Sequence, residues 1–392
     1  MQRRHDLDWV RVLAFCLLVA YHVGMYYVSW EWHVNTARPS HALEPFMVLS
    51  APWRLGLLFL VSGAATAFLL GKGEHGFLRR RSWRLLLPLL VGMLVVVPPQ
   101  SYCEVLEKLP GGYSEGYLAF WLRYLRADPG FCRDGECLVL PTWNHLWFVA
   151  YLWFYTFVLW LGLRLAPKAS ARILEAIRQA LRGRGLLVWP VLFLALARLG
   201  LFPLFDSTHA LVDDWYNHVQ YMALFVAGFA IARADAAWDA IEASRHVASA
   251  IALACGVFIG AYFHIHADGA PPPTALLWTQ RLIWAVMQWS VIVAMLGHAR
   301  HWSPVDSPLL RYLSAAVFPV YILHQTIIVV LAHHLKPLAL APVLEGPLLV
   351  VATFALSFAG VELIRRTPFL RPLFGMAGRR AGAAGHIARD PA

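Results

Sequence analysis

Arg11 and His22 lie in the first long apolar segment of the chain, at a spacing that allows them to work together. On a helix the interval is about three turns, so both side chains share one face, roughly 16 Å apart along the axis. Ionisable groups at bilayer depth are costly and usually mark a functional path. A neutral histidine beside a substrate hydroxyl is a good general base. The pair therefore predicts proton chemistry within a membrane helix.

A second histidine is predicted at the same depth as His22. His324 lies about as far into a late apolar segment, which is expected to run in the same direction. Other side chains expected near this outer-leaflet region are Trp32, His33, Asn35, His145 and Trp147. The alternative for His324 is a hydrogen-bonded packing residue. Asp8 and Arg11, three residues apart, are alternatively an interfacial ion pair that caps the helix.

An arginine cluster and one serine are further candidates. Arg79, Arg80, Arg81 and Arg84 precede Pro88, and such a cluster could bind nucleotide phosphates. It is equally a topology signal or a site for lipid headgroups. Ser62 precedes Gly63 in an apolar segment, a pattern typical of close helix packing, with a nucleophilic serine as the alternative. No histidine or cysteine set has the spacing of a metal site.

The composition requires that these residues be positioned by membrane helices. Hydrophobic residues make up 59% of the chain and charged residues 14%, and the mean hydropathy is +0.56. The net charge of +10 does not indicate a nucleic-acid partner, because the basic residues fall mainly on alternate loops, as the positive-inside rule requires. The sequence predicts an all-α, multi-pass bundle in the lipid bilayer, with both termini cytoplasmic.

Windows of about 20 apolar residues predict about ten spans. They cover 9–29, 46–70, 85–100, 144–164, 186–204, 218–233, 247–266, 277–297, 312–333 and 345–364. Residues 1–371 are expected to form one membrane-embedded domain, and 372–392 a disordered cytoplasmic tail. The outer connection 101–143 is predicted as a loop that caps the site. Within it, Cys132 and Cys137 could pair if the loop faces an oxidising compartment.

Four motifs together resemble acyltransferase family 3, the integral membrane O-acyltransferases. They are Arg11 with His22, Phe59 with Ser62-Gly63, the stretch Arg81–Arg84 before Pro88, and Tyr321 with His324. The segments Trp32–Asn35 and His145–Phe148 are most similar to the subgroup that succinylates osmoregulated periplasmic glucans. Many members of that subgroup act on unidentified glycans, so the resemblance specifies the reaction better than the substrate.

The resemblance implies transfer of a succinyl or acetyl group from cytoplasmic acyl-CoA to a glucan hydroxyl outside the bacterial inner membrane. His22 would act as the base with Arg11 as its partner, and no cofactor would be permanently bound. Arg80, Arg81, Arg84 and Ser62 would contact the donor. Arg54 or His324 would stabilise the oxyanion, and the substrate would also contact Asp8, Trp32, His33, Asn35, His145, Trp147 and Tyr321.

Several alternatives stay open at this stage. The acceptor could be lipopolysaccharide or exopolysaccharide, acetylated rather than succinylated. Transfer could be direct or proceed through an acyl group on His22 or Ser62. A non-catalytic transporter of acyl donor or glycan would also place ionisable groups in spans, but no inverted repeat is present. The sequence does not specify an oligomeric state.

Overall fold

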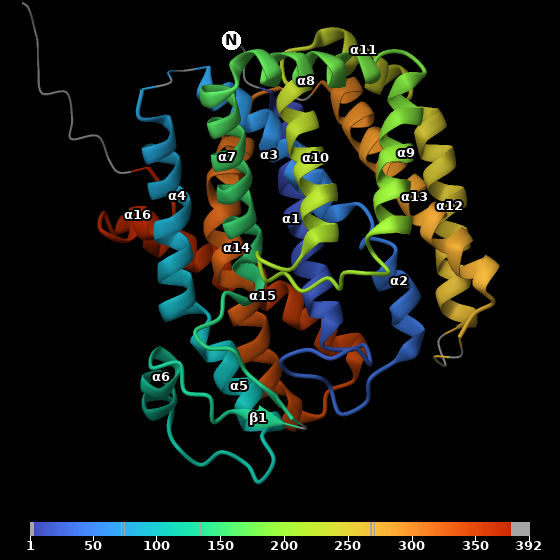
Figure 1. Cartoon of the computed structure of the whole chain (residues 1–392). Helices are drawn as coiled ribbons and strands as arrows, with labels where there is room; N and C mark the ends of the chain where they lie inside the picture. Colours follow the sequence, from blue (N-terminus) through green and yellow to red (C-terminus); the bar gives the residue numbers. More distant parts are fainter. Residues whose placement is uncertain are drawn as a thin grey trace, which may run out of the picture.

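Long apolar helices dominate the structure, a computed structural model that describes residues 4–71, 73, 75–133, 135–266, 269, 271–303 and 305–377. They run side by side through the molecule (Figure 1), which confirms the predicted multi-pass helical bundle. The long helices are α1 (His5–Met25), α3 (Arg54–Leu70), α4 (Phe77–Val91), α7 (Trp147–Leu165), α9 (Gly185–Gly200), α10 (Trp215–Ile231), α12 (Arg245–Ile265), α13 (Thr274–Trp302), α14 (Pro308–Leu335) and α15 (Pro342–Arg366).

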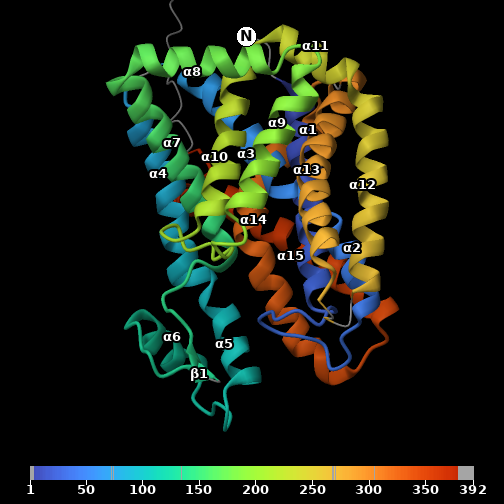
Figure 2. The same cartoon turned by 45° about the vertical axis from the view of Figure 1, so that its right-hand side comes forward.

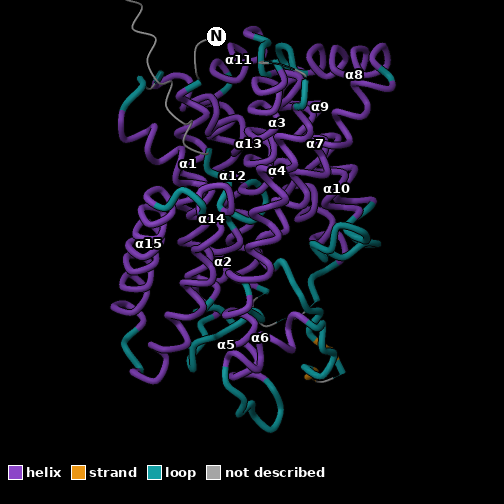
Figure 3. Tube along the Cα trace, turned by 90° about the vertical axis from the view of Figure 1, so that its left-hand side faces the viewer, coloured by secondary structure: helices purple, strands orange, loops and turns teal. Residues whose placement is uncertain are grey.

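Shorter elements connect the long helices or lie beside them. They are α2 (Glu44–Val48), α5 (Pro98–Lys108), α6 (Tyr117–Leu125), α8 (Pro167–Ala180), α11 (Asp235–Ala243), α16 (Leu370–Leu373), the turns η1 (His41–Leu43), η2 (Gly92–Val96), η3 (Asn144–Leu146) and η4 (Lys336–Leu338), and the strands β1 (Cys132–Arg133) and β2 (Glu136–Cys137). Helices α8 and α11 lie across the end that carries the N-terminus (Figure 2). Helices α5 and α6 project at the opposite end, where the longest loops also lie (Figure 3).

Each predicted span contains a helix, but not all are long enough to cross a bilayer alone. In the described part of the chain, 7 helices meet that length and composition, and up to 8 if the bent pair α8 and α9 forms one span. The axes of that pair meet at 115°. Helices α3 and α10 have 17 residues each, at the short end of the spanning range.

The predicted boundaries of the third span and of the outer loop are wrong. Helix continues from Phe77 to Lys108, through α4, the π-helical turn η2 and α5. A π-helical turn displaces backbone hydrogen bonds, and side chains from elsewhere bind the carbonyls. Tyr124 Oη donates to Met93 O at 2.9 Å, and Thr326 Oγ1 donates to Val96 O at 2.7 Å. These tertiary hydrogen bonds satisfy the carbonyls of the π-helical turn, so the helix can continue past its apolar part to Lys108. Hydropathy windows do not record such bonds.

The connection that follows α5 is structured rather than a plain loop. Helix α6 packs its aromatic face against Phe131, and Cys132 pairs with Cys137 both as β partners and as a disulfide. Arg123 donates to Asp128 and thereby lowers the pKa of that carboxyl group. A disulfide is typical of an oxidising compartment, which agrees with an outward orientation for this end.

Both described ends of the chain lie on one face. Arg4 lines the same cavity as Arg371 and Ala377, so the predicted placement of the termini on one side is supported. Residues 372–377 of the predicted tail pack on the domain, where the Gly375 backbone approaches the Phe318 ring. Residues 378–392 lie outside the described part of the chain.

Helices α3 and α10 cross at two glycines. A Cβ atom added at Gly63 would lie 1.9 Å from the carbonyl oxygen of Phe225, and one added at Gly228 would lie 1.9 Å from that of Leu60. Because small residues allow close approach of membrane helices, Gly63 has the packing role considered from sequence, whereas Ser62 lines a cavity.

The crossing predicts that Gly63→Ala destabilises the protein by about 1–3 kcal/mol, since the new methyl group overlaps a backbone carbonyl that cannot move alone. Gly260→Ala in α12 is the matched control, because no described atom lies within 4 Å of its added Cβ. Thermal unfolding of both variants in detergent measures the difference. Equal thermal unfolding midpoints for the two variants would show that α3 and α10 are not tightly packed at Gly63.

Candidate active site

His22 of α1 and His324 of α14 meet at the centre of the bundle. His22 Nδ1 and His324 Nε2 are 2.8 Å apart, and the rings are stacked at 6° with centroids 5.0 Å apart. His324 is 0% exposed, whereas His22 is half-buried. The two histidines that the sequence placed at similar depth therefore form one hydrogen-bonded pair.

The surrounding acceptors define the tautomers of this pair. His324 Nδ1 lies 2.6 Å from the carbonyl oxygen of Tyr321, and a carbonyl only accepts, so His324 Nδ1 carries a proton. In a neutral ring His324 Nε2 is then an acceptor, and His22 Nδ1 must donate to it. His22 Nε2 is left with a free lone pair. The backbone thus sets His22 in the tautomer that a general base requires.

His145 binds the same stretch of backbone. Its Nε2 donates to the carbonyls of Tyr321 at 3.1 Å and Ile322 at 3.2 Å. Its ring packs edge-on against His324, with centroids 5.2 Å apart, and Tyr321 Oη donates back to the His145 carbonyl. His145 is therefore in a position to hold Tyr321 and His324, and its own nitrogens are engaged by protein groups.

A polar network leads from this cluster to the outer end. Gln100 Nε2 lies 3.4 Å from His145 Nδ1, and Gln325 Nε2 donates to Gln100 Oε1 at 3.1 Å. Gln325 Nε2 also lies 3.1 Å from His33 Nε2, and His33 Nδ1 lies 2.6 Å from Glu104 Oε2. Glu104 lines an outer pocket of about 410 Å³ beneath the disulfide hairpin. The network thus connects the histidine cluster with the outer surface.

Arg54 approaches the pair from α3. Its guanidinium stacks 3.6 Å above the Tyr21 ring, which neighbours His22, and Nη1 donates to Ser50 Oγ at 2.7 Å. Arg54 is 5% exposed. Its Nε is buried and has no hydrogen-bond partner in the described part of the chain. A buried cationic donor is therefore present beside the histidines.

A cavity of about 750 Å³ lies below them, toward the face that carries both termini. Its arginines are Arg4, Arg11, Arg81, Arg84, Arg365 and Arg371, against the single carboxylate Asp8. Asp8 binds Arg11 at 3.1 Å, and Arg11 also donates to the Ser314 carbonyl at 3.4 Å. The cavity therefore carries a surplus of positive charge.

Part of that charge has no acidic counterpart. Among the described residues no ion pair involves Arg81, Arg84 or Arg371. The Nε atoms of Arg81 and Arg371 are buried without a hydrogen-bond partner in that same part of the chain. Buried charged groups are normally paired, so these arginines indicate an anionic ligand.

Aromatic side chains separate the cavity from the histidines. Phe15, Phe148 and Tyr321 line its inner end, and the rings of Phe15 and Tyr321 pack edge to face at 5.5 Å. His22 and His324 do not line the cavity in the described structure. The arginine-lined cavity and the histidine pair are therefore joined through Tyr321, whose side chain lines the cavity and whose carbonyl binds His324.

The remaining predicted residues divide into two groups. Ser62 and Asp8 line the cavity, whereas Arg80 is exposed and donates to the carbonyls of His75 and Gly73. Asn35 Nδ2 donates to the Trp30 carbonyl at 3.0 Å and shapes the turn after α1. Trp32 lies on the outer side, where its carbonyl accepts from Lys108.

Trp147 lies inside the bundle rather than at the outer surface. Its ring packs against His209 at 4.2 Å and against Tyr151 at 4.9 Å. Burial lowers the pKa of His209, against the opposing effect of Asp214. Both ring neighbours belong to the protein, so the geometry does not favour the predicted stacking of Trp147 on a sugar.

Sequence reasoning missed several residues of the site. Gln100, Gln325 and Thr326 lie within predicted apolar spans and belong to no motif, so their polarity there was the only available signal. Glu104 was placed in a loop because the third span was ended too early. Arg4 and Arg371 looked like topology signals at the two ends of the domain. Only their convergence in one cavity separates them from the other basic residues.

Comparison with known proteins agrees with this arrangement. The family model described as an acyltransferase domain (Acyl_transf_3) matches residues 4–362. A protein named Glucans biosynthesis protein C from Escherichia coli O6:K15:H31 is 28% identical over 159 residues, covering 38% of this chain and 36% of that protein. Proteins of the same name from Escherichia coli O1:K1 and O139:H28 are 36% identical over 62 residues, or 16% of each chain.

These matches cover about a third or less of the length of the relatives. No solved structure is significantly similar to the chain. The family match, in contrast, extends over nearly all of the described helices and includes the histidine pair and Arg4, Arg11, Arg81 and Arg84 of the cavity, whereas Arg365 and Arg371 lie beyond it. The chain therefore belongs to acyltransferase family 3 and is an integral membrane O-acyltransferase.

Proposed function

We propose that the protein moves an acyl group from cytoplasmic acyl-CoA to a hydroxyl of a periplasmic glucan, across a bacterial inner membrane. The observation that carries this proposal is the paired His22 and His324, which leaves a free His22 Nε2 above an arginine-lined cavity. The resemblance of part of the chain to proteins named Glucans biosynthesis protein C supports the choice of acceptor.

The acyl donor, acyl-CoA, is assigned to the arginine-lined cavity. Coenzyme A carries several phosphate groups, and arginine binds phosphate through parallel charge-assisted hydrogen bonds. Arg81 and Arg371 have buried donors without protein partners. The apolar part of the lining, Phe15, Val61 and Leu85, suits the pantetheine arm. The thioester would approach His22 once the Phe15 and Tyr321 rings separate.

The acceptor is assigned to the outer end. The pocket beneath the hairpin is lined by charged side chains, including Glu31, Glu104, Lys108 and Arg133, which suit hydroxyl groups. The Glu104–His33–Gln325 network connects a residue that lines this pocket with the histidine cluster. A glucan hydroxyl would enter from this side, opposite the donor.

Transfer then needs one proton to move twice. His22 Nε2 removes the hydroxyl proton while the oxygen attacks the thioester carbonyl carbon. The carbon–sulfur bond breaks, and the leaving thiolate takes the proton back from the His22 imidazolium. The products are the glucan ester and free coenzyme A.

The two candidates for oxyanion stabilisation receive different roles. His324 Nε2 accepts from His22 and is therefore not a donor in the neutral pair. Arg54 has an unused Nε–H and is the better candidate for the developing negative charge. His324 is assigned as the residue that positions His22.

We predict that His22→Ala lowers kcat by about 10²–10⁴, the usual contribution of a general base. His324→Ala should also lower kcat while leaving the KM for acyl-CoA nearly unchanged, and His324→Gln, which retains an acceptor near the Nε2 position, should restore part of it. His334→Ala is the control, since this exposed ring binds its own helix at Val330. Full activity of membrane-inserted His22→Ala would exclude the base role.

The arginine assignment predicts that Arg81→Ala with Arg371→Ala raises the KM for acyl-CoA by about 10-fold or more, because charge-assisted bonds are worth roughly 1.5–3 kcal/mol each. The same variant should use acyl-pantetheine, which lacks the nucleotide, as well as the wild type does. Arg80→Ala serves as the exposed control. An equal loss with both donors, or a reversed membrane orientation, would indicate a topology role instead.

The acceptor is tested in the source bacterium. Deletion of the gene should remove one kind of acyl substituent from the periplasmic glucans, detected by mass spectrometry as the loss of succinyl or acetyl units. His22→Ala expressed in the deletion strain should fail to restore them. Unchanged glucans together with altered lipopolysaccharide would reject the glucan and retain the acyltransferase.

A further inference from the structure

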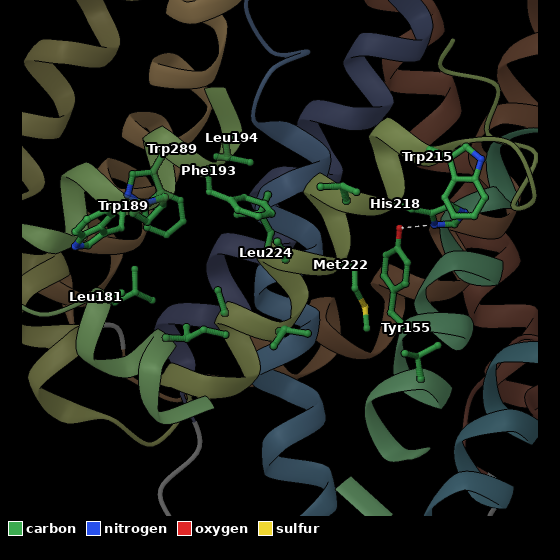
Figure 4. A pocket seen from close by; sticks show the side chains of 18 of the residues that line it. Tyr155, Leu181, Trp189, Phe193, Leu194, Trp215, His218, Met222, Leu224 and Trp289 are labelled. Atoms are coloured by element: carbon green, nitrogen blue, oxygen red, sulfur yellow. Dashed lines mark hydrogen bonds between the residues drawn. The ribbon is translucent and has the colours of Figure 1, made fainter. Parts of the chain in front are cut away.

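A second large cavity lies away from the active site, between α7, α8, α9 and α10. Its volume is about 820 Å³, within the range of ligand sites. Figure 4 shows Trp189 and Phe193 of α9 on one side, and Met222 and Trp215 of α10 on the other. Trp189, Phe193 and Trp215 are exposed large hydrophobic residues, so the groove opens laterally from the bundle.

The wall of the groove has no free hydrogen-bonding group among its buried polar side chains. Tyr155 Oη bonds to His218 Nδ1 at 3.1 Å, and His218 Nε2 binds the Leu211 carbonyl at 2.7 Å. Trp289 Nε1 donates at 2.7 Å to the carbonyl of Leu186, which lacks a helical donor because Pro190 has no N–H. A sugar or a nucleotide therefore has nothing to bind there, whereas a hydrocarbon chain fits.

The groove is long enough for one acyl chain. Its lining on α10 extends from Trp215, at the outer end of that helix, to Ala227, about 18 Å along a helix, and Ile177 and Ala180 of α8 line its cytoplasmic end. Half of a bilayer's hydrocarbon core is about 15 Å. A single acyl chain of a lipid in the cytoplasmic leaflet therefore fits within the groove, beginning at its α8 end.

Positive charge lies at the cytoplasmic end of the groove. Helix α8 and its link to α9 carry Lys168, Arg172, Arg178, Arg182 and Arg184, against the single acid Glu175. Arg182 and Arg184 are exposed, and among the described residues neither forms an ion pair. Leu181 on one side of this link and Trp189 on the other line the groove. The helix axes of α8 and α9 turn by 115° at this link. Arg182 and Arg184 therefore lie directly beside the apolar groove.

We propose that this groove binds an anionic phospholipid of the cytoplasmic leaflet, with one acyl chain between α9 and α10 and the phosphate at Arg182 and Arg184. An amphipathic basic helix in the interface attracts anionic lipids. The apolar groove beneath α8 adds a specific place for one chain, which a flat basic surface does not provide. This site is independent of the proposed acyl transfer.

The test uses the full-length protein in detergent with phosphatidylglycerol or phosphatidylcholine, and native mass spectrometry counts the lipids retained. The wild type is expected to retain one phosphatidylglycerol at a concentration about 10-fold lower than that needed for phosphatidylcholine. Arg182→Gln with Arg184→Gln should remove this preference, and Arg172→Gln in the preceding helix α8 should keep it. Equal retention of the two lipids by the wild type would overturn the proposal.

A second variant tests the groove itself. Ala227→Trp fills the apolar lining and should abolish the retained lipid, whereas Ala254→Trp on the exposed face of α12 should not. Unchanged binding in folded Ala227→Trp would contradict the proposal. Displacement of phosphatidylglycerol by a polyprenyl phosphate at a far lower concentration would also contradict it, because the groove would then belong to a lipid-linked substrate.

Discussion

The hydrogen bond between His22 and His324 joins the first helix of the bundle to a helix that begins some 300 residues later. Its direction is set by the Tyr321 carbonyl, which accepts from both His324 and His145. An amide carbonyl cannot donate, so it imposes a proton on His324 Nδ1 and leaves His22 with a free nitrogen. The chemistry of a side chain on α1 thus depends on the backbone of α14.

This dependence explains why so much of the interior is polar. A buried polar group that lacks a partner costs about as much as a lost hydrogen bond, and each member of the network from His145 to Glu104 has one. The arginine-lined cavity differs in this respect. Among the described residues the buried Nε atoms of Arg81 and Arg371 have no hydrogen-bond partner, an arrangement that fits the proposed binding of an anionic substrate.

Irregular helix and small residues make these contacts possible, because they free backbone carbonyls for side-chain donors and let helices approach closely. Pro190 frees a carbonyl for Trp289, and the π-helical turn of the third span frees others for Tyr124 and Thr326. Gly63 and Gly228 bring the backbones of α3 and α10 together. Irregular helix is tolerated at bilayer depth where protein groups satisfy the backbone.

Hydropathy and charge in the sequence determined the helical membrane class and the approximate place of each long helix, because both depend on local composition. They did not give the bounds of the third span, which continues to Lys108. The positions of His22 and His324 along their helices also predicted that the two side chains meet, since helical rise fixes depth. Tertiary structure alone decided which nitrogen of His22 is free, why Arg371 joins Arg81 while Arg80 does not, and why Trp147 packs inside the protein. These outcomes depend on contacts between residues far apart in the chain, and no local pattern records which helices are neighbours.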